Sequence, residues 1–347
     1  MKKYLNSIIS FSILQLFAEP NTHTTVTDGA EGGGLSAEMK TYYDTQLLEN
    51  ARNDLYFAQF GKKQGLPKGK GKTVEWRKWD TFSTSTTPLT EGVTPDGDKL
   101  TVQSMEATIE QYGRYGTFSD VLEFTALDDV ILGATEEFGA TGAETMDIVT
   151  RNALLTNANV FYAPDSTGKA VTTRATLTAT SFLTSAVVNK AVTILKKNKT
   201  PKINGDYIAI IHPSVAMDLR NSDGWLDAHK YASPEEIYNG EIGKLHGCRF
   251  VESNNCKVWG KDDESTPSTL SVYGCLFFGK DAYGVVDPDG AGMHMIVKGK
   301  GSAGTADPLD QRSTVGYKFS TAARVLYPER LLRVECTSSF AGDDETN

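Results

Sequence analysis

The sequence contains few of the residues that form disulfide scaffolds, metal centres and nucleic-acid-binding surfaces. Four cysteines among 347 residues are too few for a disulfide framework, so we expect reduced thiols in a protein made in a cytoplasm. The net charge of −9 leaves no basic surplus, which argues against a dedicated nucleic-acid-binding protein. The five histidines form no H-E-x-x-H pair, and no repeat of solenoid period is visible.

Two short patterns approach a cofactor or metal motif without completing it. Residues 299–304 match G-x-G-x-x-G after a predicted strand, but no helix signal follows to hold a pyrophosphate, so we interpret them as a flexible loop. His246 and Cys248 with Cys256 offer three ligands at a spacing that matches no common zinc site. No Ser, Cys or Thr stands in a nucleophile elbow. The sequence therefore predicts no catalytic residue, no cofactor and no metal.

The composition is that of an ordinary globular protein. The chain is 39% hydrophobic and 23% charged, and its length suits one large domain or two intertwined ones with a real core.

The N-terminal residues have the shape of a secretory signal. Lys2 and Lys3 precede an apolar stretch at 5–17 that is too short and too interrupted to span a membrane. A cut after Ala18 would place the large Leu16 where a small residue is needed. We therefore interpret residues 1–13 as an extension, with translation starting near Leu14; a native arm and a working signal are the alternatives.

The most informative stretch is 72–120, where two strand-like runs flank a polar tip. In the first run Val74 and Trp76 share one face, and strict alternation of this kind is typical of half-buried strands. In the return run the apolar residues change phase near Ser104, which predicts a β-bulge. The tip at 81–98 is rich in Thr, Ser, Pro and Gly and contains no lysine.

A long two-stranded arm of this kind is marginal alone in water, so we expect a neighbouring subunit to cover it. Aromatic residues concentrate at protein interfaces, and the two tryptophans of the first run lie on opposite faces. One of them should therefore be exposed in an isolated subunit. The predicted subunit contacts are Trp76, Trp79, Pro88, Leu89, Glu91 and Val93.

The remaining elements mix helices and strands without regular βαβ alternation, so the predicted class is α+β. Residues 61–71 predict a solvated basic loop, with contact to DNA or to an acidic neighbour as the alternative. Thr125 with Asp128 resembles a capping box that starts a helix at 127–156. Further helices are predicted at 35–60, 181–199 and 213–220, and strands at 207–211, 249–251, 270–278, 293–297, 315–327 and 332–336.

Several segments, in order along the chain, resemble major capsid proteins of tailed bacteriophages. The similarity is to the coat-protein family typified by phage N-four, which has the Hong Kong 97-type (Johnson) fold. It extends from about residue 35 to about residue 335, although no single motif in it is chemically diagnostic. The segments that carry it are 35–44, 57–61, 87–95, 111–113, 119–120, 160–163, 211–214, 307–312 and 316–318.

This resemblance implies a domain plan and a function. It implies an N-terminal arm (1–71), an extended loop (72–118), a peripheral domain with a spine helix (119–180), an axial domain (181–285) and a return to the peripheral domain with a long β-hairpin (286–347). The implied function is a capsid protein that assembles with itself, as hexamers and pentamers, into an icosahedral shell.

The partners and the place of synthesis follow from that function. The shell encloses double-stranded DNA without binding it specifically, and a scaffolding protein and a portal are the further partners. No membrane is involved, and the protein is made in the bacterial host cytoplasm. The alternatives are a secreted or surface β-rich binding protein, which requires a working signal, and a hydrolase or oxidoreductase, which requires a clustered site that the sequence does not contain.

Overall fold

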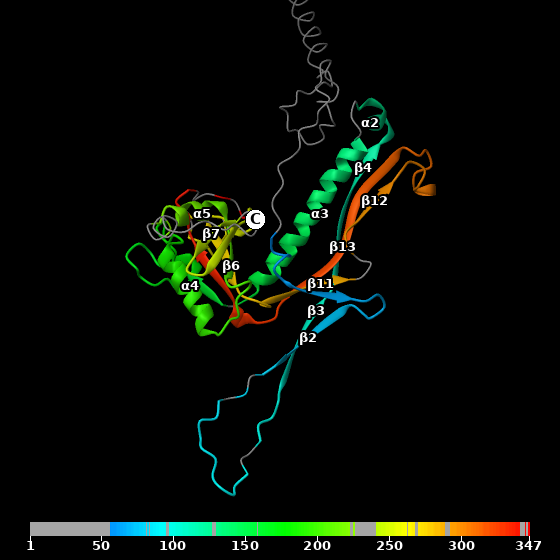
Figure 1. Ribbon diagram of the computed structural model, residues 1–347. Coiled ribbons are helices and arrows are strands. Elements are labelled where there is room, and N and C mark those ends of the chain that lie inside the picture. Colours follow the sequence, from blue (N-terminus) through cyan, green and yellow to red (C-terminus); the bar gives the residue numbers. More distant parts are fainter. Residues whose placement is uncertain are drawn as a thin grey trace, which may run out of the picture. The chain divides into compact units, whose positions relative to one another are not determined.

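Figure 1 shows the computed structural model of the chain, which describes residues 56–347 except 81, 83, 95–96, 127–129, 158, 223–224, 226–240, 262, 268–269, 289–291, 341–343 and 345. The described residues form two compact units. The smaller unit comprises 114–139 and 295–317, and the larger comprises 56–113, 140–294 and 318–347. The predicted extension at 1–13 and most of the predicted helix at 35–60 lie outside the described residues; residues 57–60 form a turn.

A seven-stranded mixed sheet lies at the centre of the larger unit. Its strands are β5 (Val160–Tyr162), β6 (Tyr207–Ile211), β7 (Glu241–Leu245), β8 (Cys248–Glu252), β9 (Lys257–Trp259), β10 (Val272–Phe278) and β14 (Leu331–Cys336). The order is β5-β14-β10-β6-β8-β7, with β9 paired to β10 beside this path. β10 pairs antiparallel with both β6 and β14, and every residue of β6 and β10 is buried. The continuous apolar run at 207–211 thus forms the buried strand that it predicted.

Two helices cover one face of this sheet. α4 (Ser185–Lys197) buries Val188 and Leu195 in a cluster with alternate residues of β6, β10 and β14. α5 (Pro213–Arg220) begins with Pro213 at its first position, and the side chain of His212 accepts a hydrogen bond from the Ser214 amide. Both helices confirm the sequence prediction.

The other face of the sheet packs against residues that lie far away in the sequence. Ile208 and Ile210 of β6 contact Leu154, Tyr56 and Phe57 in a second buried cluster. Because side chains alternate along a strand, neighbouring residues of β6 serve the two clusters in turn. This explains why β6 shows no polar position.

A second sheet contains β1 (Lys62–Leu66), β11 (Tyr283–Pro288) and β13 (Arg312–Val325). β1 is parallel to β11, and β11 is antiparallel to β13. The prediction of a loop throughout 61–71 is therefore wrong for Lys62–Leu66. The prediction failed because the lysines of this segment are exposed, as they would be in a solvated loop. The backbone of β1 nevertheless forms the edge of a sheet.

β4 (Glu110–Ser119) pairs with β13, and β12 (His294–Lys298) lies on the other side of β13. Within the smaller unit, the Phe138 ring lies 6.3 Å from the Tyr317 ring, centroid to centroid, and Gly316 packs directly against Tyr115. An added Cβ at Gly316 would be 2.7 Å from the Cβ of Tyr115, so a bare backbone is required there.

The threonine of the capping signal belongs to a separate short helix, and residues 127–129 lie outside the described residues. This helix is α2 (Asp120–Thr125), which is capped by Ser119; Thr125 is its last residue, and its hydroxyl donates to the Val121 carbonyl at 2.8 Å. The described part of the long helix is α3 (Val130–Leu155), which at ~1.5 Å per residue is about 39 Å long. The prediction of Thr125 as the N-cap of this helix is wrong, because its hydroxyl serves the preceding helix.

Most other predicted strands are confirmed within one or two residues, and β13 ends at Val325 with a 3-10 turn at Pro328–Arg330. The prediction missed β4, β5, β7, β9 and β11, most of which are short and lack an alternating pattern. Among the described helices, none combines the length and the apolar character that crossing a membrane would require.

We predict that the cap at His212 makes stability sensitive to mild acid. Burial lowers the pKa of His212 below its ordinary value of 6.5, while the charge of Asp344 opposes the shift. The unfolded chain therefore takes up a proton that the folded chain resists, so this stability is present above about pH 6.5 and is lost as pH falls. His212→Asn keeps a capping acceptor that does not titrate.

The measurement is urea unfolding of both proteins from about pH 7.5 to about pH 5.5. The wild type should lose up to ~1 kcal/mol relative to the variant across this range. Parallel stability curves would show that the cap does not titrate.

Candidate assembly surface

The hairpin formed by β2 (Thr73–Trp79) and β3 (Val102–Thr108), both labelled in Figure 1, has a partly buried face and an exposed one. The ladder is regular, from Thr73 opposite Thr108 to Trp79 opposite Val102. The predicted bulge near Ser104 is therefore wrong. The apparent phase change arises because Val102 points to the outer face beside Trp79, where an apolar residue is exposed.

The inner face of the hairpin is held by its own chain. Val74, Trp76 and Ala107 form a buried cluster with Val286 of β11 and Ala322 of β13. The Trp76 indole lies directly over Gly284, where an added Cβ would be 2.8 Å from the ring. At the loop end, Lys78 pairs with Glu329 at 3.0 Å and lies over the Tyr327 ring at 4.7 Å from its centroid.

The outer face of the hairpin is open to solvent, and so are the connecting residues 80–101. We name residues 80–101 the assembly loop. The Asp80 amide donates to the Thr101 carbonyl at 3.1 Å and closes the ladder, and beyond it every described residue of the loop is exposed. Large apolar side chains are exposed both on the outer face and in the loop: Trp79 of the outer face is 61% exposed, and Leu89 of the loop is 78% exposed. The others are Phe82, Val93, Leu100 and Val102. Grouped exposed apolar side chains indicate an interaction surface.

Of the six residues predicted to make subunit contacts, the structure buries one and exposes five. As predicted, the two tryptophans lie on opposite faces, with Trp76 buried at 7% exposure and Trp79 open. Pro88, Leu89, Glu91 and Val93 lie together in the assembly loop, and all are exposed. Trp76 is covered by its own chain, so Trp79 and the four loop residues present the open surface. Their contact with a neighbouring subunit stays a prediction.

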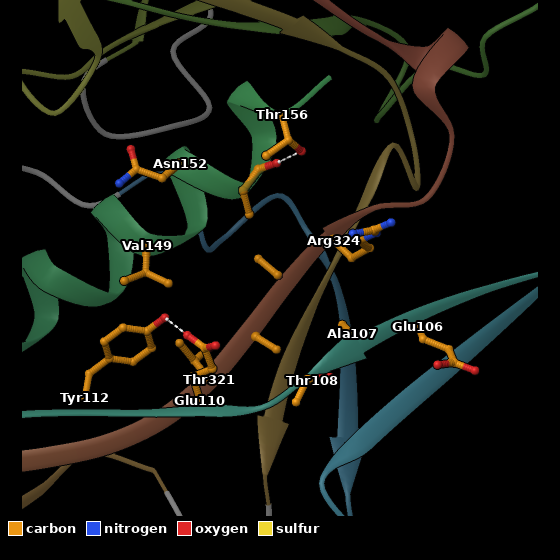
Figure 2. Close-up of a pocket in the computed structure, with 13 residues that line it drawn as sticks. Glu106, Ala107, Thr108, Glu110, Tyr112, Val149, Asn152, Thr156, Thr321 and Arg324 are labelled. Atoms are coloured by element: carbon orange, nitrogen blue, oxygen red, sulfur yellow. Dashed lines mark hydrogen bonds between the residues drawn. The ribbon is translucent and has the colours of Figure 1, made fainter. Parts of the chain in front are cut away.

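A pocket of about 560 Å³ lies beside the junction of β3 and β4, against α3 and β13 (Figure 2). Its polar groups include the carboxylates of Glu106 and Glu110, the guanidinium of Arg324 and the hydroxyl of Tyr112. Tyr112 donates to Glu110 at 3.0 Å, and burial, with this contact, raises the pKa of its hydroxyl. A raised pKa is the opposite of what a nucleophile needs, and no histidine, cysteine or lysine lines the pocket.

The residues weighed as a metal site do not converge. Cys248 belongs to the cluster under α4 and α5, whereas Cys256 belongs to the cluster on the other face of the sheet. His246 lies in a turn, with its Nε2 3.0 Å from the Ser185 hydroxyl. All four cysteines are free and buried, and no group of three potential metal ligands occurs in the described part of the chain. Residues 299–304 lead into a 3-10 turn at Gly304–Ala306, not into a helix.

Two buried carboxylates and their partners escaped sequence reasoning. Glu335 of β14 is fully buried and receives a bidentate pair of bonds from Arg174, both 2.7 Å, while Arg333 lies 2.8 Å away. Asp147 of α3 accepts from the Phe57 amide at 2.8 Å, although burial raises its pKa. No sequence signal marks the contacts of Glu335 with Arg174 and of Asp147 with Phe57, because the partners are 161 and 90 residues apart.

Solved capsid structures share the fold of this chain. The capsid structure of cyanophage P-SCSP1u is 17% identical, with 92% of this chain and 99% of that chain covered and a TM-score of 0.65. The capsid of Ralstonia phage GP4 is 14% identical, covering 91% and 98%, with a TM-score of 0.67. The capsid of cyanophage Pam1 is 12% identical, covering 87% and 97%, with a TM-score of 0.68. These likenesses confirm the predicted α+β fold of the Hong Kong 97 type.

The model of the phage capsid protein family matches residues 102–322, which is more than half of the chain. The chain therefore belongs to the phage capsid protein family. It is a structural protein of the phage shell, as the resemblance implied, and not the secreted binding protein that was the alternative. No curated protein matches the sequence.

The two tryptophans of β2 should separate folding from assembly. Trp76→Ala removes a buried side chain and should cost ~3–5 kcal/mol of subunit stability. Trp79→Ala removes an exposed one and should change subunit stability by no more than ~0.5 kcal/mol while reducing shell yield. Urea unfolding of the subunit and electron microscopy of shells measure the two effects. Equal loss of subunit stability in both variants would contradict the assignment of faces.

Proposed function

We propose that this chain is the major capsid protein of a tailed phage and that it assembles, as hexamers and pentamers, into an icosahedral shell around double-stranded DNA. The observation that carries the proposal is the assembly loop, which exposes large apolar side chains while its hairpin is fixed to its own subunit. A subunit that presents such a loop leaves its surface incomplete until a neighbour covers it. Membership of the capsid family supports this neighbour being another copy.

The free energy of such a contact accumulates by repetition. Burying a large apolar side chain is worth ~1.5–3 kcal/mol before the cost of ordering the loop. One loop contact is therefore modest, but each subunit of a closed shell gives one and receives one. Weak, repeated contacts of this kind let subunits correct their positions before the shell closes.

The charge of the chain supports a container that encloses DNA without specific contacts. A net charge of −9 does not favour tight binding of phosphates, and tight binding would oppose packaging and release. The function needs no catalytic step, and family membership supports a purely structural role.

The finer parts of the proposal rest on the resemblance to capsid proteins. They are the further partners, a scaffolding protein and a portal; synthesis in the bacterial host cytoplasm without a membrane step; and the division into arm (1–71), extended loop (72–118), peripheral domain (119–180 and 286–347) and axial domain (181–285). β14, in the last of these segments, pairs with β10 of the axial segment, so the two domains would share one sheet.

Replacing residues 81–98 with a short Gly-Ser linker should abolish closed shells while leaving the subunit folded. The reason is that every described residue of this stretch is exposed and contributes nothing to the core. Circular dichroism of the subunit should change little, and negative-stain microscopy should show no closed particles.

A second variant with a Gly-Ser linker of the original length separates the role of the side chains from that of loop length. Normal shells from both variants would refute the proposed role of the loop. A wild-type protein that forms no hexamers or shells, even with its phage partners present, would refute the capsid function itself.

A further inference from the structure

A strip of lysines follows β1 and the turn after it. Lys62, Lys63, Lys68, Lys70 and Lys72, which we name the lysine strip, are all exposed, and no acidic residue lies among positions 61–72. None of the five forms an ion pair with a described residue of its own chain. In the turn, the Lys70 amide donates to the Pro67 carbonyl at 3.3 Å, and Gly69 has a φ of +85°. A positive φ at the third position is what a type II turn requires, so this turn presents Lys68 and Lys70 in a defined conformation.

The assembly loop carries the opposite charge on a turn of the same kind. Residues 80–98 contain four acidic residues and no lysine or arginine. The Val93 amide donates to the Thr90 carbonyl at 3.2 Å, and Gly92 has a φ of +80°, so Glu91 stands at the outer corner of a turn. Neither Glu91 nor Asp98 has an ion-pair partner among the described residues. Their acidic side chains therefore lack the counter-charge that the lysine strip offers.

The two charged turns lie at opposite ends of one hairpin and cannot meet within a subunit. Lys72 adjoins the end of the ladder where Thr73 pairs with Thr108, and the assembly loop leaves from the end where Trp79 pairs with Val102. Six residue steps separate these ends, or ~20 Å at about 3.3 Å per residue. Figure 1 shows the loop running away from the end of the hairpin that adjoins the lysine strip. Because the described residues of the subunit offer neither turn a partner of opposite charge, we look for that partner on another molecule.

Apolar groups accompany the charges on both sides. A pocket of about 600 Å³ lies against the lysine turn, lined by Leu66, Pro67 and Pro288, with His294 and the carboxylate of Asp287 at its wall. In the assembly loop, the exposed side chains of Leu89 and Val93 flank Glu91 two residues away on each side. One acidic group between two aliphatic ones thus matches a pocket with aliphatic walls and lysines beside it.

We propose that the turn at 90–93 of one subunit binds the lysine turn at 67–70 of a second copy, with Glu91 facing Lys68 and Lys70, and Leu89 or Val93 entering the adjacent pocket. The contact is heterologous, because each copy offers its loop to one neighbour and its lysine strip to another, so it suits a closed ring of subunits. This inference rests on the proposed capsid function and names the receiving surface that the function leaves open.

Charge reversal tests the pairing. E91K and K68E/K70E should each raise the free-subunit concentration at which shells form by about two- to fivefold per ion pair lost, and the effect should shrink in high salt. The chain that carries all three substitutions restores opposite charges and should assemble close to the wild type. A matched control, K190E/K197E, makes the same charge change on the exposed side of α4 and should assemble normally.

Disulfide trapping tests the same contact without relying on assembly yield. The four native thiols are buried, so cysteines placed in the two turns would be readily oxidised while the native ones are protected. Protein carrying Glu91→Cys, mixed with protein carrying Lys70→Cys and oxidised with copper phenanthroline, should give a mixed dimer. Each protein oxidised alone should give far less disulfide-linked dimer.

The possible results separate the inference from the function on which it rests. Shells without the mixed dimer, or normal assembly of both charge-reversed variants, would overturn the pairing and leave the capsid function standing. If K68E/K70E forms normal shells that retain less DNA, the lysine strip contacts the genome instead. That result would also overturn the pairing of the two turns. If no shells form from the wild type, the trapping experiment on free protein still decides whether the two turns meet.

Discussion

The contact between the Trp76 indole and the bare backbone of Gly284 fixes the hairpin on which the assembly surface depends. An added Cβ at Gly284 would be 2.8 Å from the ring, so no other residue permits this approach. With Trp76, Val74 and Ala107 buried against β11 and β13, the inner face of the hairpin belongs to the subunit core. The outer face and the loop are then left for other molecules. This contact thus assigns the inner face of the hairpin to the subunit core and leaves the outer face for contacts with other molecules.

The fold was predictable wherever burial imposes a regular pattern. The buried run at 207–211, the proline-led helix at 213–220 and the long strand β13 follow from local composition and from alternation. The failures have physical causes. β1 places lysines on a sheet edge, where exposure resembles that of a loop, and Thr125 is the last residue of one short helix instead of the N-cap of the next. Local sequence patterns indicate whether a side chain is exposed, but they do not indicate which distant strand its backbone pairs with.

The candidate site was predictable in part for the same reason. The opposite faces of Trp76 and Trp79 follow from strand geometry alone, and the exposed loop follows from its lack of apolar runs. The ion pair of Glu335 with Arg174 and the hydrogen bond from the Phe57 amide to Asp147 depend on tertiary approach. Burial removes solvent from such pairs and makes them sensitive to the loss of either partner. Nothing in the neighbouring sequence of these residues signals that requirement.

The spacing of apolar residues in the assembly loop bears on the life of the subunit before it meets a neighbour. Six polar or proline residues separate Phe82 from Leu89, Glu91 and Gly92 interrupt the next step to Val93, and Pro95 follows. Amyloid-like stacking requires an uninterrupted stretch of about six residues with high β-propensity, low charge and no proline. Between Pro88 and Pro95 no such stretch exists, because the two prolines bound the segment and Glu91 and Gly92 interrupt it. The part of the loop that carries Leu89 and Val93 therefore exposes apolar side chains without the pattern that favours stacking against the same segment of other copies.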